Sequence, residues 1–76
     1  EAVRRTLGEV IKAHRQRCQM TQEFVAESLG VSRQAVSKWE MGTSEPSTSN
    51  LMALAQLFGV TAEELLREVA GETENE

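Results

Sequence analysis

Hydrophobic residues recur every three to four positions along most of the chain, a spacing that places them on one face of an α-helix. Five such segments can be recognised, and each follows a Thr or Ser that can cap a helix. They begin after Thr6, Thr21, Ser32, Ser47 and Thr61. The loops between them are short, and there is no strand signal. The pattern therefore predicts an all-α fold of five helices.

The residues around these segments mark where the helices start and end. A glutamate stands three positions after Thr6 and after Thr61, the spacing of a capping box. We expect the first helix to end near Arg17. Each of the next three helices is closed by a glycine, at Gly30, Gly42 and Gly59, and Gly30 is expected to be a left-handed cap.

The predicted helices form one domain, residues 6–70, in a chain of 76 residues. A chain of this size can fold alone around a thin core. Residues 1–5 are expected to form an arm, and residues 71–76 to form an acidic tail with too few apolar side chains to fold. Because the chain begins at Glu1 rather than Met, we also expect that it has been trimmed.

Cysteine and histidine are scarce, which limits the chemistry open to the chain. His14 and Cys18 are the single residues of their kinds and stand four positions apart. Two ligands are too few for a structural zinc site, so we expect no metal and no cofactor, with His14 at the surface and Cys18 half-buried. There is no Asp and little volume for a pocket, so an enzyme is the least favoured class. A lone thiol suits a reducing compartment.

Membrane partners are also disfavoured. No apolar run approaches the roughly 18 residues that a membrane-spanning helix needs, and no signal peptide is visible.

The net charge of −4 argues at first against a nucleic-acid partner, but the charge is unevenly distributed. Residues 1–38 carry seven basic and four acidic residues, a net of +3, whereas residues 39–76 carry one basic and eight acidic residues, a net of −7. Such asymmetry permits one basic face on an acidic protein.

The third predicted helix, residues 32–41, has a composition that suits DNA recognition. Gly30 and Val31 form a tight turn before it, so the second and third helices can cross as in a helix-turn-helix. Ala35, Val36 and Trp39 form its inner face. The outer face carries residues that can bond to base edges in the major groove, as Arg does to guanine and Gln to adenine: Arg33, Gln34, Ser37 and Lys38.

The stretch TQEFVAESLGVSRQAVSKWEMG resembles the helix-turn-helix of phage repressor and Cro proteins, a large bacterial family often called the xenobiotic-response-element type. Pro46 and the later stretch FGVTAEELL extend the resemblance to about residues 7–66. Agreement at several separated features makes it more specific than a match over 20 residues. It implies a five-helix, lambda-repressor-like DNA-binding domain, and a cytoplasmic, nucleoid-associated transcriptional regulator, which we expect to be a repressor.

The resemblance implies roles for individual positions. Gln22 would bond to a phosphate and brace Gln34. The backbone N–H groups of Gln22 and Glu23 would form an anion site at the start of a helix. Thr43 and Ser44 would contact phosphate from the loop after the recognition helix.

One implied pair is structural. In the family, an arginine of the first helix pairs with the glutamate that ends the recognition helix, and here these are Arg15 and Glu40. We expect the pair to lock the two helices together.

Departures from the family pattern point to weaker DNA binding. Residues 43–45 are Thr-Ser-Glu, where the family usually has basic residues, and Arg4 and Arg5 would have to supply phosphate contacts instead.

Gln19 stands where glycine is frequent in the family, so we expect a left-handed residue there at a cost of about 1 kcal/mol or more.

We expect a homodimer on double-stranded DNA, with Leu65, Leu66 and Val69 in the dimer interface. The alternative function is a protein-interaction or antitoxin-type module with weak or no DNA binding, because fold does not dictate function. Phe24 and Met41 are candidates for an apolar partner surface in that case. The outward polar residues of the third helix could also be ordinary solvated side chains.

Overall fold

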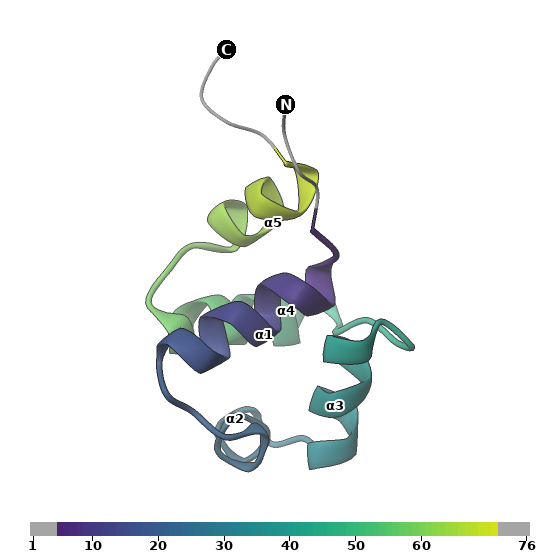
Figure 1. The fold of residues 1–76 in the computed structure, drawn as a ribbon. Helices are drawn as coiled ribbons and strands as arrows, with labels where there is room; N and C mark the ends of the chain where they lie inside the picture. The colour runs from purple at the N-terminus through teal and green to yellow at the C-terminus, as the bar shows by residue number, and fades with distance from the viewer. Residues whose placement is uncertain (1–4, 72–76) are drawn as a thin grey trace.

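The computed structural model describes residues 5–71, which fold into the five predicted helices. These are α1 (Leu7–Arg17), α2 (Gln22–Leu29), α3 (Arg33–Met41), α4 (Thr48–Phe58) and α5 (Ala62–Ala70). Figure 1 shows α5 at one end of the molecule and α2 with α3 at the other, with α1 and α4 between them. The predicted all-α fold is confirmed, whereas most of the predicted arm and acidic tail lies outside the described residues.

The helix boundaries follow from local hydrogen bonds, as the sequence predicts. All five predicted capping residues accept a bond from the backbone N–H three positions later, and both predicted capping boxes are formed. Gly30 has a φ of +74°, which only glycine adopts easily. Gln19 is also left-handed, with a φ of 58°, so the expected strained residue is present.

The core forms around α1, which packs against α3, α4 and α5. Ile11, Val25, Val36 and Leu54 are fully buried in the main cluster. A smaller cluster of Val10, Ala55 and Leu65 attaches α5. Leu65, which is predicted to lie in a dimer interface, therefore belongs to the core of the single chain. Its side chain is 0% exposed, because α5 needs it to pack against α1 and α4.

The expected surface position of His14 is also wrong. The residue is only 3% exposed, its ring stacks on Phe58 at a centroid distance of 5.6 Å, and its Nε2 lies 3.1 Å from the Glu68 carboxylate. His14 thus joins α1, α4 and α5. Cys18, expected to be half-buried, is exposed at the end of α1.

The helices α1 and α3 approach each other closely at Gly8. A Cβ placed on this residue would lie 2.6 Å from the Glu40 carbonyl oxygen, and closer still to that of Trp39. No side chain fits there. Gly8 therefore lets the backbone of α1 rest directly on the C-terminal turn of α3.

A buried ion pair fastens the same two helices. Arg15 donates from Nε to Glu40 Oε2 at 2.6 Å and from Nη2 to Oε1 at 3.1 Å. The side chains are only 12% and 4% exposed. Arg15 also donates to the Met20 carbonyl oxygen at 2.8 Å, which fixes the turn before α2. The structural pair implied by the family resemblance is therefore present, with two parallel bonds.

Replacing Gly8 with alanine should destabilise the fold, because the new Cβ would overlap backbone atoms that cannot rotate away. We expect the free energy of unfolding to fall by about 1–3 kcal/mol, the usual cost of overpacking. Urea denaturation followed by circular dichroism measures this. Gln16→Ala, at an exposed position of α1, is the matched control and should change stability by less than about 0.5 kcal/mol. A G8A chain as stable as the parent would contradict the close helix contact.

Replacing Glu40 with alanine should cost roughly 3–5 kcal/mol, because it leaves the Arg15 guanidinium buried without its counter-charge. That is a large share of the stability of so small a domain. The same urea experiment on Glu45→Ala is the control, since Glu45 is exposed in the loop that follows. Equal denaturation midpoints for the two variants would show that the pair does not hold the helices together.

Candidate nucleic-acid interface

One face of α3 is held in the core and the other is open. Val36 is fully buried and Trp39 is 5% exposed, which confirms that the indole is a core residue rather than a stacking surface for bases. The opposite face carries the four predicted base-contacting residues, of which Ser37 is half-buried and the others are exposed: Arg33, Gln34, Ser37 and Lys38. The structure therefore places all four on one accessible helix.

The tight turn between α2 and α3 leaves the outer face of α3 open to solvent. Gly30 turns the chain, and the Val31 N–H donates to the Ala26 carbonyl oxygen at 3.0 Å. Val31 is half-buried and packs against the main core cluster. Ser32 caps α3 by accepting a bond from the Ala35 N–H at 3.1 Å. Because α3 starts directly after this turn, Arg33 lies at its exposed N-terminal end.

Hydrogen bonds connect the buried ion pair to this exposed end. The Gln22 amide donates from Nε2 to Glu40 Oε1 at 3.0 Å, and its Oε1 accepts from Arg33 Nη1 at 3.4 Å. These bonds form one continuous polar network of four side chains: Arg15, Glu40, Gln22 and Arg33. The family resemblance implies that Gln22 braces Gln34, whereas in the structure Gln22 bonds to Glu40 and Arg33. No local sequence signal reveals these contacts, which join residues 18 and 11 positions apart.

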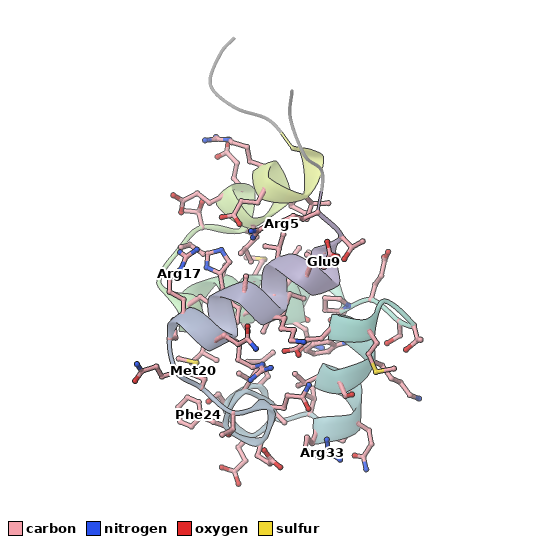
Figure 2. The ribbon with its side chains drawn as sticks, viewed as in Figure 1. Arg5, Glu9, Arg17, Met20, Phe24 and Arg33 are labelled. Atoms are coloured by element: carbon pink, nitrogen blue, oxygen red, sulfur yellow. The ribbon has the colours of Figure 1, made fainter. Side chains whose placement is uncertain are left out.

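Arg33 has a second partner on α2. Its Nε lies 3.8 Å from Glu23 Oε2, in a pair whose side chains are 47% and 70% exposed. Figure 2 shows Arg33 at the start of α3 and Phe24 on the side of α2 that faces away from it. The guanidinium is therefore flanked by an amide oxygen and a carboxylate, both from the first turn of α2.

The remaining predicted phosphate contacts fall into two groups. Thr43 and Ser44 are exposed in the loop after α3, where Thr43 donates from both its N–H and its hydroxyl to the Lys38 carbonyl oxygen. They lie beside the recognition helix, as expected. Arg5 lies far from Arg33 in Figure 2, toward the α5 end, so the two do not form one basic patch. Arg4 lies outside the described residues.

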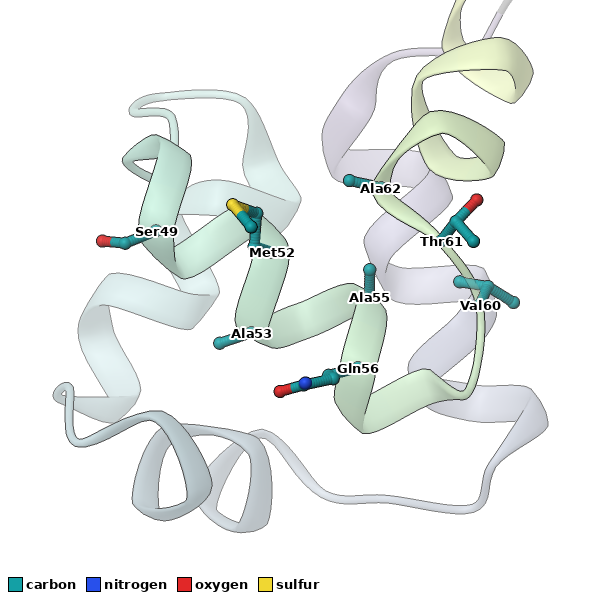
Figure 3. A pocket seen from close by; sticks show the side chains of 8 residues that line it. All are labelled: Ser49, Met52, Ala53, Ala55, Gln56, Val60, Thr61 and Ala62. Carbon is teal, nitrogen blue, oxygen red and sulfur yellow. The ribbon is translucent and has the colours of Figure 1, made fainter.

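The predicted dimer surface is only partly available. Leu66 is 49% exposed, but Val69 is half-buried against the small cluster beneath α5. Figure 3 shows a hollow between α4 and α5, to which Met52, 59% exposed, contributes. Its other lining residues are Ser49, Ala53, Ala55, Gln56, Val60, Thr61 and Ala62. None of the eight has an ionisable side chain, so the hollow offers no general acid or base.

No three His, Cys, Asp or Glu side chains among the described residues 5–71 lie close enough to hold a metal ion. Over the same residues, no helix has the length and apolar character of a membrane span. The candidate site is therefore the exposed face of α3 together with the adjoining first turn of α2.

Comparison with known proteins gives several relatives. The chain is 49% identical over 47 residues to the HTH-type transcriptional activator BcrR of Enterococcus faecalis, a match that covers 62% of this chain and 23% of BcrR. It is 42% identical over 53 residues to the HTH-type transcriptional regulator DicA of Escherichia coli, covering 70% of this chain and 39% of DicA. The chain thus spans less than half the length of these relatives.

A solved structure agrees with most of the fold. The P22 c2 repressor in complex with a synthetic operator superimposes with a TM-score of 0.78 and 33% identity, covering 84% of this chain and 97% of the repressor chain. A family model described as helix-turn-helix matches residues 11–65. That range holds α2, α3, α4 and most of α1, including all four residues of the polar network. The chain therefore belongs to the Cro/C1-type helix-turn-helix family.

Proposed function

We propose that this domain is a sequence-specific DNA-binding transcriptional regulator. The observation that carries the proposal is the row of exposed hydrogen-bonding side chains on α3, whose inner face is fixed by Val36 and Trp39. A helix of nine residues anchored from behind fits the B-DNA major groove. Its polar face would otherwise meet only water.

Base reading would follow from the chemistry of the side chains. Arg33 can donate two bonds to guanine O6 and N7, and Gln34 can bond to both N6 and N7 of adenine. Ser37 is small enough to allow close approach. Lys38, four residues after Gln34, is placed to contact a further base edge or a phosphate. The α2 N–H groups of Gln22 and Glu23 would bind a backbone phosphate, since helix N-termini attract anions.

The named relatives support this class of function. One is a transcriptional activator, another a transcriptional regulator, and the structural neighbour is a repressor bound to an operator. Because both an activator and a repressor occur among them, we propose regulation of transcription, and repression stays a prediction. The proposed activity needs cellular DNA, so we place the protein in the cytoplasm.

Binding as a homodimer would explain how so small a surface gains specificity. Two copies related by a twofold axis would place their recognition helices about 34–36 Å apart, in successive major grooves on one face of a palindromic site. Leu66 and the hollow beneath Met52 offer apolar surface at the α5 end, away from α3. This leaves the recognition face free for DNA.

A protein-interaction module is the second candidate, favoured by one observation. Met41 is 71% exposed on α3, and its Sδ lies 3.6 Å from the Ser37 hydroxyl. An apolar thioether therefore sits beside the polar row, and the loop after it is not basic. A duplex-binding measurement separates the two functions, because DNA binding weakens strongly with added salt.

Selection of binding sites from random duplex DNA, followed by fluorescence anisotropy on the recovered site, tests the main proposal. Arg33→Ala and Gln34→Ala should each weaken binding by about 1–3 kcal/mol and relax the preference at one base pair. The matched controls are Arg17→Ala and Gln16→Ala, which remove the same exposed residue types from α1.

The controls should bind as tightly as the parent chain. Recovery of two half-sites about one helical turn apart would support the dimer. If no sequence is enriched and the affinity for duplex does not change with salt, the protein-interaction function would replace the present one.

A further inference from the structure

The Glu23 carboxylate lies within the proposed DNA-binding surface, where a negative charge is unexpected. It is 70% exposed on the first turn of α2 and lies 3.8 Å from the Arg33 guanidinium. DNA phosphates would approach the same turn. A carboxylate there weakens attraction to any duplex, whatever its sequence, so its placement calls for an explanation in terms of specificity.

The geometry around Arg33 supplies that explanation. Glu40 accepts hydrogen bonds only, so the Gln22 amide must turn its NH₂ toward Glu40 and its oxygen toward Arg33. Gln22 therefore holds Arg33 Nη1 from a fixed position, because Glu40 is itself locked by Arg15. Glu23 faces Nε instead. Arg33 therefore has one neutral partner that is held in place, Gln22, and one exposed and charged partner, Glu23.

The two partners affect Arg33 differently when DNA arrives. A backbone phosphate can also accept two bonds from Arg, but it is an anion, and the Glu23 carboxylate partly neutralises the guanidinium charge that attracts it. Guanine offers O6 and N7 together, an arrangement that Arg matches with two parallel bonds. Because these acceptors are uncharged, a carboxylate that partly neutralises Arg33 penalises a phosphate contact more than a guanine contact.

We propose that Glu23 is a specificity-determining residue, which acts through Arg33 to suppress binding to non-cognate DNA. This inference rests on the DNA-binding function proposed above. It concerns the Glu23 side chain and is separate from the phosphate contact expected of its backbone N–H. The interaction between Glu23 and Arg33 is electrostatic and solvent-exposed, so its effect on DNA affinity is small and decreases as salt is added.

Glu23→Gln and Glu27→Gln form a matched pair of variants. Both remove one negative charge from an exposed position of α2, but only Glu23 has a carboxylate paired with Arg33 in the described part of the chain. The assay measures affinity for random-sequence duplex and for the site selected by the parent chain. We expect E23Q to raise the affinity for random duplex roughly twofold to fivefold more than E27Q does.

The same comparison on the selected site should show a smaller gain, so that E23Q lowers the ratio of specific to non-specific affinity. Repeating both variants in an Arg33→Ala background tests the route of action. Without Arg33, the excess effect of E23Q over E27Q should become much smaller, because only direct repulsion between Glu23 and phosphate would remain. Thermal unfolding of each variant checks that the fold is kept.

The results separate failure of this inference from failure of the function beneath it. If the parent chain binds no duplex, both are wrong. If it binds DNA, but E23Q and E27Q raise random-duplex affinity equally, only the role of Glu23 is wrong. An excess effect of E23Q that is undiminished in the Arg33→Ala background would overturn it too, because Glu23 would then act only by repelling phosphate directly.

Discussion

The buried ion pair between Arg15 and Glu40 is the interaction on which the presentation of α3 depends. Both charges are largely removed from water, which is costly unless each is fully bonded. Two parallel bonds to Glu40, with the Met20 carbonyl on the remaining nitrogen, meet that requirement. Gly8 permits the close backbone approach that such short bonds need. The pair thereby sets the position of α3 against α1, and with it the position of every outward residue.

The same pair is connected to the surface through the polar network. An acceptor-only carboxylate fixes the orientation of the Gln22 amide, and that orientation decides which atom Arg33 meets. A buried, charge-assisted contact thus orders an exposed side chain without covering it. Ordering of this kind reduces the conformational entropy that Arg33 would lose on binding a ligand. Glu23, whose side chain is 70% exposed, lies against the same guanidinium at its Nε.

The acidic net charge is compatible with a polyanionic partner because of where the acids lie. Glu63, Glu64 and Glu68 belong to α5, at the opposite end of the molecule from the start of α3. Charges separated by more than about 8–10 Å across solvent are largely screened at physiological salt. The field near α3 is then set by its own basic residues and by the acidic residues of α2 and of the following loop (Glu23, Glu27 and Glu45), rather than by the total of −4.

The sequence by itself determined the five helices and the inner face of α3, because caps and hydrophobic spacing act between residues three or four positions apart. Trp39 was assigned to the core for that reason. Only the tertiary structure decided the surroundings of His14, whose partner Glu68 is 54 positions away, and the burial of Leu65 beneath α5. It also decided that Gln22 meets Glu40 and Arg33. Helical spacing shows which face of a helix is apolar, but which side chains meet across two helices depends on how those helices pack.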